Sequence, residues 1–193
     1  MAIIANTLIV LLFLSLGVVN AEEKYSRYEK PDYWFSIMYP TSWKLEETKL
    51  GYKFTVKFLG DSGNIVVAVK EPMDFHKKII GFIKEANLSE SALKDFGHMI
   101  YDKVPGVLDA KVFITTLSNE RALGSVYFYE VNTLGSALGY MRILKLETLH
   151  NDKFYKLEVS TQLNDSPQMA NKAFDKIWPV FELAIKSFVF LPY

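Results

Sequence analysis

Residues 52–59 carry the pattern that constrains the fold most. Apolar side chains stand at every second position, and lysine or threonine stands between them. A period of two is that of a β-strand with one buried face and one wet face. Turn residues follow at positions 60–64, and residues 65–69 are then apolar throughout, as in a strand covered on both faces. The sequence therefore predicts a β-hairpin, and with it a sheet.

Further segments have the composition of strands. Residues 35–39 end at Pro40, which lacks the N–H donor that a ladder needs, and Trp43 begins another short extended piece. Residues 107–117, 123–131, 140–149 and 154–161 are rich in β-branched and aromatic side chains. Residues 150–153, between the last two of these, are typical of a hairpin turn.

Apolar side chains recur at helical spacing in the middle and at the end of the chain. The middle contains two predicted helices, with apolar faces at Phe75, Ile79, Phe82, Ile83 and Ala86, and at Leu93, Phe96, Ile100 and Val104. Ser89 is the predicted N-cap of the second, which Leu88 and Leu93 would staple and which Pro105-Gly106 would stop.

The last helix is predicted to start at Asp165-Ser166-Pro167 and should kink or restart at Pro179. Its apolar stripe consists of Ala170, Phe174, Ile177, Phe181, Ile185 and Phe188. Strands, two helices, strands and a helix in this order predict an α+β domain with a mainly antiparallel sheet.

The N-terminus is read separately from the fold. Residues 1–21 contain no charged side chain and end in Val19-Asn20-Ala21, which predicts a signal peptide cleaved after Ala21. Retention of residues 3–19 as a membrane anchor is the alternative. Residues 22–31 are read as a polar tether and residues 32–190 as a single domain. In either case we expect an extracytoplasmic protein, periplasmic or secreted.

Composition excludes several kinds of protein. The 193 residues contain 22 Lys and Arg against 22 Asp and Glu, so we expect no nucleic-acid partner. The same balance argues against a protein held at an anionic membrane by charge alone, and we expect membrane contact only through an uncleaved leader. The absence of Cys rules out disulfides, thiolate metal sites and a catalytic Cys.

Four short segments resemble landmarks of the PsbP-like family, the extrinsic photosystem II proteins and their relatives in the PsbP/Mog superfamily. They are residues 33–43 with their Tyr-Pro-x-x-Trp turn, residues 63–69, the Asn-Asp-Lys-Phe-Tyr of residues 151–155, and Ser187-Phe188. The resemblance implies an α/β/α sandwich with an antiparallel sheet between helices, and it implies binding rather than catalysis. Because members of this superfamily share a fold and little else, it does not name a ligand.

No arrangement of residues predicts a catalytic, cofactor or metal site. The three histidines, His76, His98 and His150, are far apart in sequence, although His98 has Asp95 three residues before it and His150 has Asp152 nearby. Gly124-Ser125 and Gly135-Ser136 lack the surroundings of a nucleophile elbow. Glu46-Glu47 and Lys77-Lys78 are read as solvated charges.

One group of aromatic residues could serve binding. Tyr127, Phe128 and Tyr129 are consecutive and so cannot all face one side of a strand. Exposure of Tyr127 and Tyr129 together with Trp34 would mark an interaction patch.

The function we predict is an exported, non-enzymatic PsbP-like accessory protein that docks on a membrane or envelope complex. Two alternatives stay open: an extracytoplasmic small-ligand carrier with an apolar cavity between sheet and helix, and an enzyme whose site assembles from distant residues such as His98, Asp95 and a serine. No cofactor is expected for the accessory protein.

Overall fold

The computed structural model describes residues 23–85, 88–133 and 136–192. The predicted leader at residues 1–21 and Ala86 of the first predicted helix lie outside this part of the chain. In chain order the elements are β1 (Tyr25–Lys30), η1 (Pro31–Tyr33), β2 (Phe35–Pro40), β3 (Lys44–Leu50), β4 (Lys53–Leu59), β5 (Gly63–Lys70), α1 (Asp74–Glu85), α2 (Glu90–Tyr101), β6 (Val107–Leu117), β7 (Glu120–Thr133), β8 (Ser136–His150), β9 (Lys153–Thr161), α3 (Pro167–Ser187) and β10 (Val189–Phe190).

The strands form two sheets. The larger has seven strands in the order β3-β4-β5-β9-β8-β7-β6, and the smaller has three in the order β1-β2-β10. Every pairing between the described strands is antiparallel. The predicted hairpins of residues 52–69 and 140–161 are present as β4–β5 and β8–β9.

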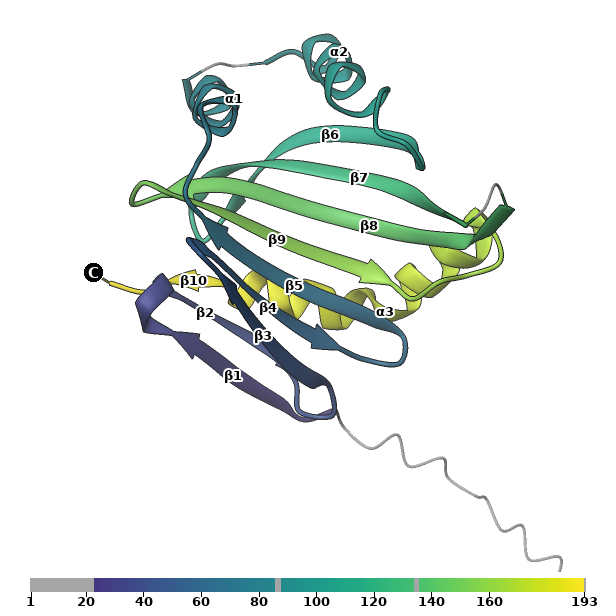
Figure 1. Cartoon of the computed structure of the whole chain (residues 1–193), viewed down its shortest axis with the longest axis horizontal. Coiled ribbons are helices and arrows are strands. Elements are labelled where there is room, and N and C mark those ends of the chain that lie inside the picture. The colour runs from purple at the N-terminus through teal and green to yellow at the C-terminus, as the bar shows by residue number, and fades with distance from the viewer. Residues whose placement is uncertain (1–22, 86–87, 134–135, 193) are drawn as a thin grey trace, which may run out of the picture.

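Helices lie on both faces of the large sheet (Figure 1). On one face α3 packs against β5, β8 and β9, and the small sheet lies beside it, with β2 against α3. On the other face α1 contacts β7 and β8, and α2 contacts β6. This arrangement confirms the predicted α+β fold, an α/β/α sandwich around an antiparallel sheet.

The main core lies between the large sheet, α3 and the small sheet. It unites side chains from both ends of the chain, because Phe35 of β2 stacks on Phe188 with ring centroids 5.7 Å apart. Phe174, Ile177 and Phe181 of α3 pack into the same cluster. The apolar stripe predicted for the last helix therefore faces the core, and α3 continues as one helix through Pro179.

The N-terminal boundary differs from the prediction. The polar tether predicted at residues 22–31 is wrong for Tyr25–Lys30, which form β1 and pair with β2. The charged residues there mask an alternation in which Tyr28 turns inward and packs against the rings of Phe35 and Phe58 at 5.9 and 5.5 Å. The folded body therefore begins before residue 32, at β1.

The N-terminal ends of α2 and α3 agree with the prediction, whereas the buried face of α1 differs from it. Ser89 Oγ accepts a hydrogen bond from the backbone N–H of Ala92, and Ser166 Oγ accepts one from that of Met169. In α1, however, Ile80 and Ile83 are the buried residues, whereas the predicted core residues Phe75 and Phe82 are more than half exposed. Ile80 and Ile83 pack with Leu123 of β7, and the rings of Phe75 and Phe82 are therefore turned away from the sheet.

The second helix ends earlier than predicted. Its last residue is Tyr101, and Val104 lies exposed beyond it. No helix in the described ranges is both long and apolar enough to cross a membrane.

Candidate functional site

The face of the large sheet that carries α1 and α2 is covered only in part. These helices lie over β6, β7 and β8, and α1 reaches the remaining strands of this face at the end of β9, where His76 contacts Phe154. The uncovered part is hollowed into a groove of about 480 Å³. We call it the lysine groove; its lining consists of Lys53, Thr55, Lys57, Leu59, Asn64, Val66, Ala68, Lys70, Met141, Glu147, Phe154, Lys156, Glu158 and Ser160.

Strand register places lysines side by side at one end of the groove. Phe54 pairs with Val69, so the next pair along β4 and β5 brings Lys53 opposite Lys70. Across the following ladder Lys70 pairs with Phe154, and Lys156 lies one step diagonally from it. Like charges directly opposite each other destabilise a sheet, so this arrangement calls for an explanation.

The carboxylates of the groove are engaged elsewhere. Glu158 binds Lys156 at 2.8 Å and Glu147 binds Lys145 at 3.2 Å. Within the described part of the chain, no carboxylate forms an ion pair with Lys53 or Lys70.

The electrostatic surroundings of Lys70 reflect this crowding. Burial lowers its pKa below the usual value for lysine, and Glu147 opposes that effect. The positive charges of Lys53, Lys156 and Lys145 lower the pKa further, because each disfavours a second cation nearby. An anion at this end of the groove would relieve the repulsion.

Aromatic side chains form the wall next to these lysines. The ammonium of Lys70 lies 5.0 Å from the centre of the Phe154 ring, and the ring of His76, at the start of α1, packs against the same ring at a tilt, with centroids 4.1 Å apart. Burial and the nearby Lys70 lower the pKa of His76, so its imidazole stays neutral at pH 7. His76 therefore contributes a ring and not a charge.

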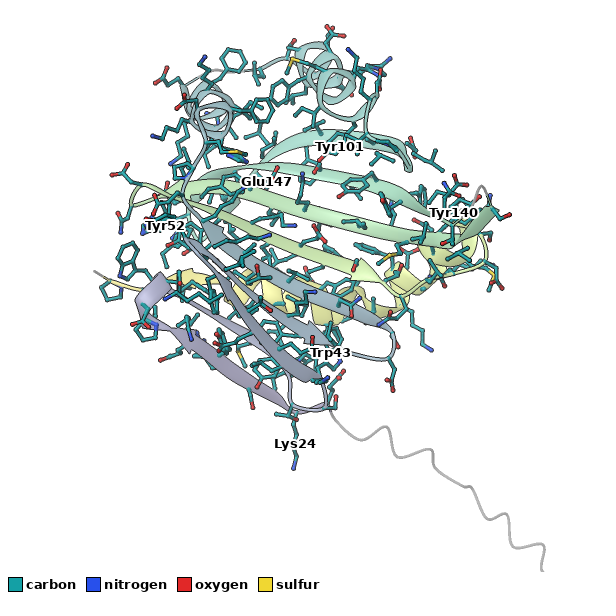
Figure 2. All side chains as sticks on the ribbon, in the orientation of Figure 1. Lys24, Trp43, Tyr52, Tyr101, Tyr140 and Glu147 are labelled. Atoms are coloured by element: carbon teal, nitrogen blue, oxygen red, sulfur yellow. The ribbon has the colours of Figure 1, made fainter. Side chains whose placement is uncertain are left out.

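A second polar cluster lies beneath α2. Tyr101, at the end of α2, donates a hydrogen bond of 2.7 Å to Ser125 Oγ (Figure 2), and Lys145 lies 5.2 Å from the same ring. Burial disfavours the charge of Lys145, but Glu147, Tyr101 and Tyr127 together outweigh that effect and raise the pKa of Lys145. A lysine that holds its proton this firmly cannot act as the base of a Ser–Lys pair, and Ser125 is fully buried.

The structure keeps the other predicted candidates apart. His98 binds Asp102 at 3.1 Å on the exposed side of α2, instead of Asp95. His150 binds Glu120 at 3.1 Å, instead of Asp152, and stacks on Phe190. Among the described residues, no three His, Asp or Glu side chains gather as a metal site would need.

The remaining charged and aromatic candidates have structural partners or stay solvated. Glu46 binds Lys44 and Glu47 binds Lys30, while Lys77 and Lys78 are exposed on α1. Tyr127 is only 8% exposed and packs on Tyr101, so the patch that would join it to Tyr129 and Trp34 does not form.

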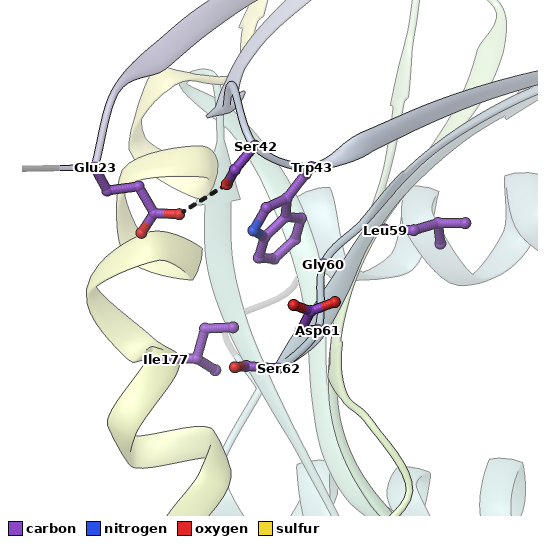
Figure 3. A pocket seen from close by; sticks show the side chains of 8 residues that line it. All are labelled: Glu23, Ser42, Trp43, Leu59, Gly60, Asp61, Ser62 and Ile177. Carbon is purple, nitrogen blue, oxygen red and sulfur yellow. Dashed lines mark hydrogen bonds between the residues drawn. The ribbon is translucent and has the colours of Figure 1, made fainter. Parts of the chain in front are cut away.

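A smaller pocket of about 250 Å³ lies where the start of the domain meets α3 (Figure 3). Trp43 and Ile177 form its apolar wall, and Glu23, whose carboxylate accepts a hydrogen bond from Ser42 Oγ at 3.5 Å, lies at its mouth. The Trp43 ring stands over Gly60, where a Cβ would come within 2.3 Å of it. These contacts fit a role in packing the β2–β3 corner onto the β4–β5 turn.

Sequence reasoning missed the lysine groove. Its lysines belong to strands that meet only in three dimensions, and the wet face of residues 52–59 was the one signal available. Alternation shows that Lys53 and Lys57 point away from the core, but it cannot show that α1 and α2 leave this face open.

An α+β protein of this architecture has a Mog1/PsbP-like fold. Ran-binding protein Mog1p of Saccharomyces cerevisiae shares it with a TM-score of 0.51 at 8% sequence identity, over 88% of this chain and 97% of that one. This likeness confirms the fold that the resemblance in sequence implied.

Two other solved structures are similar at lower TM-scores. The cyanobacterial PsbP of Synechocystis aligns at 16% identity and a TM-score of 0.49, over 91% of this chain and 97% of that one. LpqN of Mycobacterium tuberculosis aligns at 12% identity and a TM-score of 0.46, over 88% of this chain and 91% of that one. Comparison of the sequence with family models and with curated proteins finds no match.

Proposed function

We propose that this chain is an exported, non-enzymatic accessory protein that binds an acidic segment of a partner protein in the lysine groove. The observation that carries the proposal is the pair Lys53 and Lys70, adjacent across two strands with no carboxylate between them. Sheets avoid such pairs unless something else compensates, and a bound carboxylate would do so.

The shape of the groove favours a segment of chain over an enclosed small molecule. The groove is open, runs across β4, β5 and β9, and mixes lysines with apolar positions such as Val66, Ala68 and Met141. An extended segment with alternating acidic and apolar residues would match this lining, since its side chains also repeat with a period of two.

We infer export from the apolar leader predicted at residues 1–21. We infer the absence of catalysis from the burial, protonation and hydrogen-bond partners of the candidate catalytic residues. Ser125 is buried, Lys145 holds its proton, and His98 and His150 are each bound to one carboxylate with no nucleophile beside them. This arrangement supports binding rather than bond breaking.

A labelled peptide that alternates glutamate and valine tests the proposal by fluorescence anisotropy. We expect the wild-type chain to bind it in a salt-dependent way, and the variant Lys53→Glu/Lys70→Glu to bind about tenfold or more weakly, because two attractive contacts become repulsive. Lys172→Glu, on the exposed surface of α3, is the matched control and should bind as the wild type does.

Pull-down from envelope extracts with the same three proteins extends the test to the natural partner. A partner retained by the wild type and the control but lost with the groove variant supports the proposal. Equal binding of the peptide by all three proteins, or turnover of a substrate without any partner, contradicts it.

A further inference from the structure

Exposed apolar side chains gather at one end of the molecule. Leu50 and Tyr52, at the tip of the β3–β4 hairpin, are 77% and 84% exposed, and Met73 and Phe75, at the start of α1, are each 57% exposed. We call these four residues the apolar edge. Soluble proteins rarely group large apolar side chains this openly without a partner for them.

The register and the contacts of α1 place the two pairs at the same end of the sheet. The hairpin tip leads directly into Lys53, which lies opposite Lys70, the last residue of β5. Met73 follows three positions later, and its backbone N–H donates a hydrogen bond to Nδ1 of His76, which packs at a tilt against Phe154 beside Lys70. Figure 2 shows Tyr52 at this end and Tyr140 at the opposite end of the large sheet.

The orientation of α1 is part of this feature. Phe75 and Phe82 occupy positions that helical spacing assigns to the core, yet Ile80 and Ile83 make the contacts with the sheet. The buried face of α1 thus consists of isoleucines, and the aromatic rings of Phe75 and Phe82 face outward. Phe75 contacts His76 edge-on at 6.0 Å, yet both phenylalanine rings stay more than half exposed.

Positive charge surrounds the apolar edge. The segments that form this end of the molecule carry Lys49, Lys53, Lys70, Lys77, Lys78 and Lys153 against Glu71, Asp74 and Asp152. Lys153 is bound by Glu71, and the other lysines leave this end positive although the whole chain has no net charge. The composition argued against a membrane contact made by charge alone. The apolar edge differs because it combines a local positive charge with exposed apolar area.

We propose that the apolar edge docks on a lipid surface that carries anionic headgroups. Leucine, methionine and aromatic side chains enter the interfacial region of a bilayer readily, and lysines beside them attract anionic headgroups. The hairpin tip and the start of α1 are the inserting elements. This gives the folded domain a membrane contact of its own, independent of the leader and of a partner in the lysine groove.

The absence of Cys allows a site-specific test in the full chain. Tyr52→Cys and Leu138→Cys each introduce one attachment point for an environment-sensitive fluorophore. Leu138 is the matched control because it is also apolar and exposed, at 55%, and lies near Tyr140 at the other end of the sheet. Every variant keeps the same leader, so the difference between the two labels reports on the edge.

With vesicles of phosphatidylcholine and phosphatidylglycerol, we expect the label at position 52 to shift to the blue and to be quenched by brominated acyl chains. The label at position 138 should stay in water, and raising the salt concentration should weaken the response. Pure phosphatidylcholine vesicles should give a much smaller effect. A second variant, Leu50→Ser/Phe75→Ser with the label at 52, should lower the vesicle affinity about tenfold, since both changes remove exposed apolar area.

The proposal is overturned if the label at position 52 does not respond to anionic vesicles, or if both labels respond alike. It is also overturned if the edge variants instead abolish a dimer of the wild-type chain, because the edge would then be an interface between copies. Anisotropy with the acidic peptide is read separately, so loss of one interaction does not imply loss of the other.

Discussion

Gly63 and Gly81 should respond oppositely to substitution by alanine, because their surroundings in the fold differ. At Gly63, in β5, a Cβ would lie 2.7 Å from the carbonyl oxygen of Ser160 and 2.8 Å from the Phe181 ring. At Gly81, in α1, a Cβ would meet nothing within 4 Å. We expect Gly63→Ala to lower the free energy of unfolding by about 1–3 kcal/mol through overpacking. Gly81→Ala should raise it by up to about 1 kcal/mol, because alanine is the better helix former.

Chemical denaturation followed by circular dichroism measures both variants. Equal effects at the two positions would contradict the close approach of β5, β9 and α3 at Gly63.

A second prediction at the scale of residues concerns pH. Burial alone would raise the pKa of Glu120, but hydrogen bonds from Lys84 and His150 lower it below its usual value. A carboxylate with a lowered pKa stabilises the fold above its unfolded pKa of about 4.3, and that contribution disappears as the pH falls through the folded pKa. Glu120→Gln should therefore cost stability at pH 7, by up to about 1 kcal/mol for such a half-exposed group.

The difference between Glu120→Gln and the wild type should shrink toward zero below about pH 4. Thermal or urea unfolding at a series of pH values measures it. A difference that stays constant from pH 7 to pH 3 would show that the carboxylate charge is not responsible.

At the scale of elements, the same lysines that would bind an acidic segment in the lysine groove are expected to lower the stability of the sheet. Lys53 and Lys70 lie opposite each other on β4 and β5, and cross-strand like charges cost a few tenths to about 1 kcal/mol. Lys53→Gln should therefore leave the protein equally stable or stabilise it by about that amount, raise the pKa of Lys70, and weaken the acidic peptide. Lys172→Gln should change none of the three.

Three measurements test these expectations: urea unfolding for stability, NMR titration for the pKa of Lys70, and fluorescence anisotropy for peptide binding. A loss of stability in Lys53→Gln would show that the groove lysines are structural after all.

The strands were the most predictable elements, for a local reason. Alternation predicts correctly that Phe54, Val56 and Phe58 point to the core, although Tyr52, just before β4, is exposed. Ser89 and Ser166 supply the side-chain oxygen that a helix start needs. The edge strand β1 was not predicted, because its charged residues obscure the alternation of its side chains. The inward face of α1 escaped because spacing cannot tell Ile80 from Phe82 when only a narrow strip of the helix is covered.

The candidate site was beyond the reach of the sequence because it depends on sheet order. Lys70 and Phe154 become neighbours only when β9 inserts beside β5, and Lys53 matters only because no helix covers it. A single sequence contains the residue types of the groove but not the pairing that brings them together.

At the scale of the whole molecule, Phe188 links the two sheets and α3. It is 1% exposed, follows the last residue of α3, stacks on Phe35 of β2 and meets Phe190 of β10 edge-to-face. Phe188→Ala should lower the free energy of unfolding by about 3–5 kcal/mol, the range for large aromatic residues in a core.

Because the small sheet and the large sheet share one core, we expect the variant to unfold in a single transition. Far-ultraviolet circular dichroism and tryptophan fluorescence should give the same midpoint. Separate midpoints would mean that the two sheets are independent units.

The position of β10 has a consequence for the order of folding. Strand β2 has β1 on one side, contributed by the start of the domain, and β10 on the other, contributed by the last residues before the C-terminus. The N-terminal sheet thus cannot be completed until residue 190 has been synthesised, since Phe190 must pair with Phe35. A nascent chain on the ribosome can form its hairpins locally, but this long-range closure must wait until α3 and β10 have been synthesised.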